Sequence, residues 1–206
     1  MTNEYKVDWN NLRNEIAIAA ARMIAEEGAT YEMAKKKAMR QILGNSRIKG
    51  EFLPNNDEIE DELRIYNALF MADTQPARLL HLRQVALRMM YELAQFQPHV
   101  TGAVLNGTAG EHSDIHLQLF AENVKDVEIS LLNKHIEIAV TEAPSNRGKI
   151  QAIEIIHLYH EREIFHLSVY NPDDMRKMAK AANAQAEKAN IKELERLIQQ
   201  QTDALL

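Results

Sequence analysis

The stretch VTGAVLNGTAGEHSDIHLQLFA, residues 100–121, decides how this chain folds. Its first residues are mostly strand formers, and Gly107 then breaks the run. From Asp114 onward polar and apolar residues alternate, which is the pattern of a strand with two different faces. We therefore expect a strand over residues 100–105, a glycine turn, and a second strand whose Asp114 and His116 project from one face.

A candidate site lies in the turn between these two strands. Gly107 and Thr108 end the first expected strand, and Asp114 and His116 follow closely in the sequence. Backbone amides and a hydroxyl at a strand end suit a phosphate group, and a carboxylate beside an imidazole suits a metal ion. The stretch therefore predicts a combined metal and phosphate site.

Gly107-Thr108 followed by Ser113-Asp114-Ile115-His116-Leu117 resembles the active-site motif of the nucleotidyltransferase superfamily of the DNA polymerase beta type, especially its minimal bacterial members. In that family one strand ends in Gly-Ser, the next carries Asp-h-Asp with h apolar, and a following strand supplies a third carboxylate. The resemblance covers residues 100–170. It implies a small mixed sheet whose carboxylates hold two magnesium ions and whose ligand is a nucleoside triphosphate.

The resemblance also implies roles for individual residues. Three of them, Gly107, Thr108 and Ser113, would contact the nucleotide. Asp114 and His116 would bind the metal together with a third carboxylate. That carboxylate is sought at Glu137, between two isoleucines of an expected third strand over residues 135–140, or else at Glu154. Asp114 and Glu137 are thus the predicted catalytic residues.

The chain departs from the family pattern in two places. His116 replaces the second aspartate, and the turn from Gly107 to Ser113 looks shorter than in active relatives, which carry extra residues there for the triphosphate. Imidazole is a poor ligand for Mg²⁺ but suits Mn²⁺ or Zn²⁺. We therefore expect a weakly active or non-catalytic nucleotide-binding protein. The alternative is a regulatory or interaction module on a sheet that has lost its chemistry.

Composition narrows the class of protein. The 206 residues are 46% hydrophobic and 26% charged, as in an ordinary globular protein with a sizeable core. Without cysteine the chain has no disulfide, no thiolate metal site and no cysteine nucleophile. The first residues are polar and acidic, unlike a signal peptide, and no apolar run is long enough to span a bilayer. We expect a cytoplasmic protein with no membrane partner.

The first half of the sequence has the apolar period of helices. Gly28 and Gly44 are typical helix ends, Thr30 and Asn56 are expected helix caps, and Pro76 suits a first helical turn. The expected helices cover about residues 9–27, 31–44, 57–71 and 76–96. Pro98 then separates this half from the sheet. The predicted fold class is α+β, with a helical domain over residues 1–97 and a nucleotidyltransferase-like domain with a C-terminal helix over 98–206.

A basic run in the helical half is a second candidate site. Its members, which have no acidic residue among them, are Lys35, Lys36, Lys37, Arg40, Arg47 and Lys49. They form either a phosphate-binding patch for RNA or nucleotide, or a solvated helix face. The net charge of −6 argues against a general nucleic-acid coat but leaves a local patch open.

Two alternating segments, residues 151–159 and 164–170, predict a hairpin around Glu161-Arg162. In that register His157 lies opposite His166, either as a transition-metal pair or as part of a polar sheet face. The opposite face is expected to be buried and consists of Ile156, Leu158, Phe165, Leu167 and Val169.

The last expected helix carries only a narrow apolar stripe, made of Ile191, Leu194, Leu197 and Ile198. Such a helix packs by one seam on the body of the protein or pairs with a second copy, so a homodimer is one expectation. The sequence contains no phosphate loop, no dinucleotide fingerprint, no Gly-x-Ser-x-Gly and no His-Glu-x-x-His. It therefore predicts no ATPase, dehydrogenase or zinc protease of those motif classes.

Overall fold

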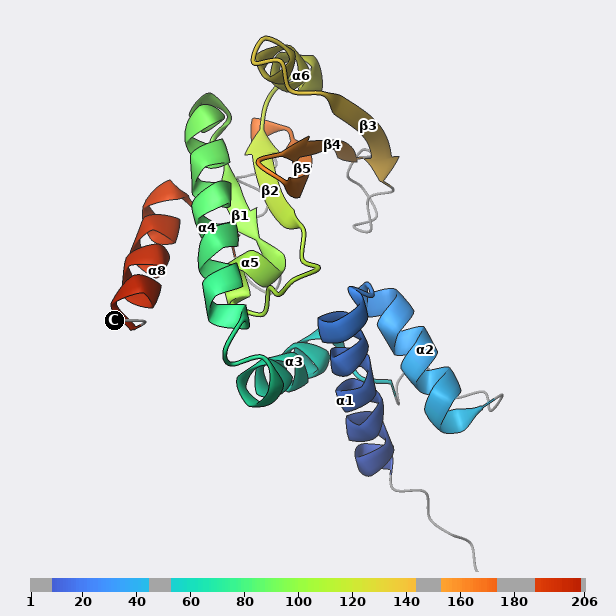
Figure 1. Ribbon diagram of the computed structural model, residues 1–206. Coiled ribbons are helices and arrows are strands. Elements are labelled where there is room, and N and C mark those ends of the chain that lie inside the picture. The colour runs from blue at the N-terminus through green and yellow to red at the C-terminus, as the bar shows by residue number, and fades with distance from the viewer. Residues whose placement is uncertain (1–8, 45–52, 144–152, 174–187, 205–206) are drawn as a thin grey trace, which may run out of the picture. The chain divides into compact units, whose positions relative to one another are not determined.

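The computed structural model of the protein describes residues 9–44, 53–143, 153–173 and 188–204. In these ranges three helices come first, a mixed sheet with its helices follows, and a helix comes last, so the predicted α+β class is confirmed (Figure 1). Contacts divide the chain into two units. One comprises Met1–Gln75 with Gly110–His112, and the other comprises Pro76–Ala109 with Ser113–Leu206.

The first unit is built from α1 (Trp9–Glu27), α2 (Tyr31–Leu43) and α3 (Asn56–Phe70). Small side chains let these helices approach closely around a few large ones. The buried members are Ile16, Ala17, Ala20, Ala21, Met23, Ala34, Ala38, Ile59 and Leu63. Gly28 ends α1 with φ 66°, and a side chain there would meet the Cβ of His112 at 2.6 Å. Glycine is therefore required at this turn.

Caps explain where α2 and α3 begin. The hydroxyl of Thr30 accepts the amide of Met33 at 3.3 Å, as expected. The cap of α3 is Asn55. The expected cap, Asn56, was wrong by one residue. Asn55 Oδ1 accepts the Glu58 amide at 2.8 Å, and Glu58 accepts the Asn55 amide at 2.7 Å. This reciprocal capping box needs the acidic partner three residues on, which selects Asn55.

The sheet of the second unit has the strand order β3-β4-β5-β2-β1-β6. Its strands are β1 (His99–Thr101), β2 (Ile115–Phe120), β3 (Ile138–Ala143), β4 (Ile153–His160), β5 (Glu163–Tyr170) and β6 (Lys188–Ala189). Only β2 and β5 pair in parallel, and the other described pairs are antiparallel. The parallel pair brings β5, late in the sequence, beside the decisive β2 strand.

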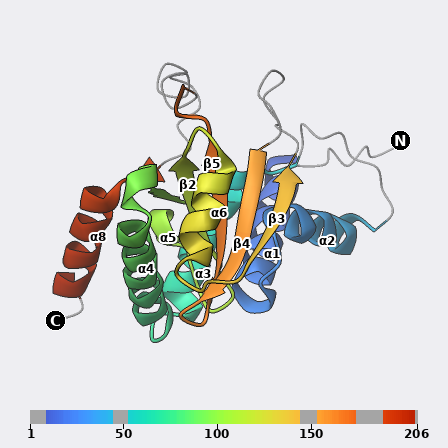
Figure 2. The ribbon, with the colours of Figure 1, turned by 90° about the horizontal axis from the view of Figure 1, so that it is seen from above.

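The core of this unit lies between one sheet face and the helices α4 (Gln75–Glu92), α6 (Val124–Leu132) and α8 (Ile191–Ala204) (Figure 2). Helix α4 contributes most of its apolar side chains to this core. The division between units therefore falls at Gln75, whereas the sequence placed it at residue 97, because α4 packs with the sheet. Helix α8 buries Leu194 against the same core, so its apolar seam packs on its own chain.

Residues 102–105 do not continue the first strand, which is a correction. The strand ends at Thr101, and Gly102–Asn106 form the short helix α5. Arg83 of α4, only 7% exposed, donates from Nε to the carbonyl of Val104 and from Nη2 to that of Leu105, both at 3.0 Å. These contacts satisfy carbonyls at the end of α5 and outweigh the strand preference of valine and leucine.

The predicted hairpin of β4 and β5 is confirmed. His157 pairs with His166, and the five residues expected to be buried are buried. Glu161 and Arg162 have φ of 50° and 68°, as a two-residue type I′ turn requires. The third strand was expected from His135, which is wrong, because α6 is followed by a turn in which His135 has φ 59°. The strand β3 begins only at Ile138.

None of the helices in the described ranges combines the length and the apolar character that crossing a membrane requires.

Candidate functional site

Three histidines form a row across the sheet of the second unit. His116 of β2 pairs with His166 of β5, which pairs with His157 of β4. Side chains alternate between faces along a strand, so all three share the face opposite the buried Leu117 and Leu167. The parallel pairing of β2 and β5 therefore assembles a histidine cluster beside Asp114.

Hydrogen bonds join this cluster into one chain. Asp114 Oδ2 lies 2.9 Å from His166 Nε2. His166 Nδ1 lies 2.7 Å from His157 Nδ1, and His157 Nε2 lies 2.7 Å from Thr141 Oγ1 of β3. The chain runs from the residue before β2, through β5 and β4, to β3. Each of the four side chains is thereby held by at least one neighbour.

The carboxylate fixes the proton positions along this chain. A carboxylate only accepts, so a His166 with one ring proton carries it on Nε2 and donates it to Asp114. The Nδ1 of His166 then accepts from His157, and the Nε2 of His157 accepts the Thr141 hydroxyl. Every hydrogen bond therefore points from Thr141 toward Asp114.

His116 stacks on this chain, with its ring centroid 4.8 Å from that of His166 and the ring planes 26° apart. Desolvation lowers the pKa of His116, and His166 lowers it further, while Asp114 opposes them. Desolvation and His166 also lower the pKa of His157. These two imidazoles are therefore neutral at pH 7 and available as proton acceptors or soft ligands.

The residues predicted to contact a nucleotide lie in the turn before Asp114. Gly107 ends α5 in the left-handed region with φ 91°. Thr108 is buried, and its amide and hydroxyl both donate to Asn106 Oδ1, at 3.0 and 2.7 Å. Ser113 directly precedes Asp114 and is half-buried. The structure thus places these residues near Asp114 in the chain, with the Thr108 hydroxyl bonded within its own turn.

Neither candidate for the third carboxylate lies beside Asp114. Continuing the strand register sets Glu137 level with Asp114 but three strand spacings away, about 14 Å. Glu154 pairs with Val169, on the opposite face of the sheet. In the described ranges no group of three or more histidine, cysteine, aspartate or glutamate residues is arranged to hold a metal ion. The predicted ligand set of Asp114, His116 and Glu137 is therefore not brought together.

His166 is the site residue that sequence reasoning did not connect with Asp114. The hairpin pattern predicts the partner of His166 in β4, and that partner is correct. It gives no information about the other neighbour of β5, because a parallel partner is joined through a long crossover. The sequence feature that could have identified His166 is a polar residue on a strand that is able to pair with β2 in parallel.

Two arginines of α4, Arg78 and Arg88, hold the hairpin. Arg78 Nη2 lies 2.7 Å from Oε2 of the buried Glu163, and His81 Nε2 lies 3.0 Å from Oε1. Burial raises the pKa of Glu163, but the hydrogen bonds from these two residues outweigh it and lower the pKa. Arg88 pairs with Glu161 of the turn.

Three lysines of the basic run in α2 interact with nearby acidic or amide side chains. Lys36 lies 2.6 Å from Glu32, Lys37 lies 3.0 Å from Glu27, and Lys35 donates to Asn56 at 3.3 Å. Arg47 and Lys49 lie outside the described residues. The described lysines therefore have the character of a solvated helix face.

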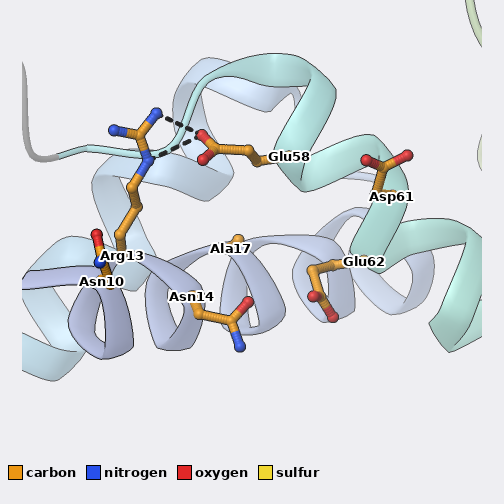
Figure 3. Close-up of a pocket in the computed structure, with 7 residues that line it drawn as sticks. All are labelled: Asn10, Arg13, Asn14, Ala17, Glu58, Asp61 and Glu62. Carbon is orange, nitrogen blue, oxygen red and sulfur yellow. Dashed lines mark hydrogen bonds and ion pairs between the residues drawn. The ribbon is translucent and has the colours of Figure 1, made fainter.

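A polar groove with a volume of about 360 Å³ lies between α1 and α3 of the first unit (Figure 3). Its lining residues are Asn10, Arg13, Asn14, Ala17, Glu58, Asp61 and Glu62. Arg13 is bonded to Glu58 Oε2 at 2.6 and 2.9 Å, as the dashed lines in Figure 3 show. With its cation neutralised, the lining is net acidic, so the groove does not favour a phosphate group.

The arrangement beside Asp114 thus offers one carboxylate, three imidazoles and a threonine hydroxyl. It provides neutral proton acceptors in a fixed chain, and His116, which stacks on that chain, could bind a divalent ion. No family model matches the sequence, and no curated protein matches it either. The function is therefore inferred from this geometry and from the resemblance of the motif.

Proposed function

We propose that the protein is a nucleotidyltransferase-like protein that binds a nucleoside triphosphate and has little or no Mg²⁺-dependent transfer activity. We expect it to work in the cytoplasm. The observation that carries the proposal is the 2.9 Å contact of Asp114 with His166, beside the stacked His116. His166 contacts the one motif aspartate and His116 stacks on His166, where active members of the resembled family use further carboxylates.

Charge explains why imidazoles in place of carboxylates would weaken the binding of two Mg²⁺ ions. Two divalent ions a few Å apart repel strongly, and clustered carboxylates offset that repulsion. Neutral imidazoles at His116 and His166 supply no negative charge. Mg²⁺ also prefers oxygen ligands, so a single Mn²⁺ ion is the better fit to Asp114 and His116.

The nucleotide part of the proposal rests on the turn that precedes Asp114. Gly107 ends α5 in a left-handed conformation, which glycine adopts without steric cost. In the family that this motif resembles, the corresponding turn contacts the triphosphate. Asp114 and His116 would hold the ion, which would supply positive charge to offset the charge of the phosphate groups.

The test combines nucleotide binding with a transfer assay. Equilibrium binding of a fluorescent ATP analogue is measured with Mn²⁺, with Mg²⁺ and with EDTA, and pyrophosphate release is followed in parallel. We expect Mn²⁺-dependent binding that Asp114→Asn removes, and no pyrophosphate release above background. Glu154→Gln, on the opposite sheet face, is the matched control and should bind like the wild type. Robust Mg²⁺-dependent release, or absence of binding with either metal, would overturn the proposal.

An interaction module on the same fold is the second candidate, and one observation favours it. Helix α3 exposes large apolar side chains toward its C-terminal end: Ile65 is 52%, Leu69 is 68% and Phe70 is 67% exposed. Exposed apolar residues gathered on one helix are typical of a protein contact. Sedimentation of the wild type and of Leu69→Lys with Phe70→Ser tests whether a second copy binds there.

A further inference from the structure

Thr141 is the last residue of the hydrogen-bonded chain that begins at Asp114. Its side chain is exposed, whereas that of Thr108 is buried. Thr141 lies on β3, which is the edge strand of the described sheet. Its hydroxyl lies 2.7 Å from His157 Nε2, within the range in which a base accepts a nucleophile's proton. An accessible hydroxyl thus contacts an imidazole that other groups hold in place.

The imidazole has the proton arrangement that a base needs. With Asp114 as a carboxylate and no added proton, the reverse arrangement would set two acceptors against each other at His166 Nε2. Only one arrangement satisfies the whole chain, and in it His157 Nε2 is unprotonated. The lowered pKa of His157 keeps that nitrogen unprotonated at neutral pH.

The sheet itself fixes these positions. His157 and His166 are direct cross-strand partners. Thr141 is diagonal to His157, because it pairs with Ile155, and Asp114 is diagonal to His166. A site held by adjacent strands is positioned more accurately than one held by loops.

We propose that Thr141 is a nucleophile, activated by His157, with which the protein cleaves neutral activated carboxylic esters without a metal ion. His166 and Asp114 are positioning residues that hold His157 in the required tautomer. The activity goes beyond nucleotide binding and does not depend on it. A neutral ester is favoured over a phosphate ester because the cross-strand and same-strand neighbours of Thr141 on this face, Ile155, Ile153 and Ala139, carry no charge.

The reaction has two balanced halves. Thr141 Oγ forms a bond to the ester carbonyl carbon while its proton moves to His157 Nε2, and the bond from that carbon to the alcohol oxygen breaks. The departing alcohol takes the proton from Nε2. Water then attacks the acyl-threonine with His157 again as base, and the carboxylic acid leaves as Thr141 regains its proton. Backbone amides of the edge strand are donors of the kind that stabilise an oxyanion.

The probe is p-nitrophenyl acetate in the presence of EDTA, with release of nitrophenol and mass-spectrometric mapping of the acetylated residue. Acetyl-Thr141 should appear in a stopped reaction, and turnover should exceed the buffer rate. Thr141→Val should abolish both, and Thr141→Ser should retain them. His157→Gln should slow turnover by roughly 10²- to 10⁴-fold, as loss of a general base does.

Matched controls separate this activity from structural damage and from nucleotide binding. Thr101→Val removes a hydroxyl from the same sheet face and should leave ester cleavage unchanged. Thr141→Val should leave Mn²⁺-dependent nucleotide binding unchanged, so either proposal can fail while the other stands. Acetylation confined to lysine or histidine, or turnover that survives Thr141→Val, would overturn the assignment.

Discussion

Single residues decide the chemistry on the polar face of the sheet. His116 stands where the motif that the sequence resembles has an aspartate, and His166 of β5 pairs with it. A carboxylate contributes a full negative charge and hard oxygen atoms, whereas a neutral imidazole contributes neither. Under the proposed function, this difference in side-chain chemistry is the reason why the site should not support two-magnesium transfer.

Histidines with lowered pKa make stability depend on pH. Desolvation is the largest effect on His99 and, with Lys188, outweighs the hydrogen bond to Gln97 and the charge of Glu193 to lower its pKa. In the unfolded chain the pKa returns to about 6.5, so the unfolded state binds more protons in the window below that value. The free energy of unfolding should therefore fall as pH drops from about 7 through 6.5 toward the folded pKa.

Urea unfolding of the wild type and of His99→Gln between pH 7.5 and 5.5 measures this dependence. The variant should lose less stability over that range than the wild type. His135→Gln changes an exposed turn histidine and should follow the wild-type curve. An equal pH dependence for all three proteins would exclude His99 as a contributor.

The buried Arg83 predicts a large effect from one side chain. Its guanidinium also donates to Gln201 Oε1 of α8 at 3.0 Å, in addition to the two carbonyls of α5. Arg83→Met should lower the free energy of unfolding by on the order of 3 kcal/mol, since it leaves buried acceptors unpaired. Arg64→Met removes an exposed arginine that pairs with Glu60 and Asp61, and should cost less than about 1 kcal/mol. Equal losses for the two variants in denaturant unfolding would contradict this role.

At the scale of elements, the hairpin was predictable and the short helix was not. The alternation of polar and apolar residues over β4 and β5 predicts the strand register. The turn residues and the apolar face each indicate the same register. Residues 102–106 carry strand formers, yet they form α5 around a guanidinium from a helix about twenty residues earlier in the chain. The parallel pairing of β2 with β5, and with it the place of His166, likewise depends on contacts distant in sequence.

The confirmed register gives a direct stability prediction. Phe165 is fully buried on the core face of β5, so Phe165→Ala should cost roughly 3–5 kcal/mol in denaturant unfolding. Tyr159→Ala, on the other face of β4 and 66% exposed, should cost less than about 1 kcal/mol. A loss below about half a kcal/mol for Phe165→Ala would contradict the packing of this face.

At the scale of the whole molecule, the division of the chain into two hydrophobic cores was only partly predictable. The two hydrophobic clusters share no residue, and α4 belongs to the cluster that includes the sheet. The apolar stripe of α4 was visible in the sequence, but a stripe does not say which surface covers it. Pro98 therefore suggested a boundary one helix too late.

Net charge and local pairing together predict no tight binding of RNA. The chain carries −6, and the described lysines of α2 lie beside Glu27, Glu32 and Asn56. Fluorescence anisotropy with a labelled single-stranded RNA at low salt should show no saturable binding. Tight binding that weakens steeply with added salt, and that is lost on Lys36→Glu with Lys37→Glu, would restore the phosphate-binding patch.

The most direct test of the proposed metal site is a metal titration of the wild type and of His116→Asp, followed by calorimetry and by the Mn²⁺ paramagnetic resonance signal. His135→Asp is the control, because it makes the same change of charge. The wild type should bind a single Mn²⁺ and bind Mg²⁺ more weakly. His116→Asp should strengthen Mg²⁺ binding on the order of tenfold, about 1.4 kcal/mol, whereas His135→Asp should not. Two Mg²⁺ ions bound tightly by the wild type, or equal gains for both variants, would contradict the assignment of His116 as the residue that weakens the site.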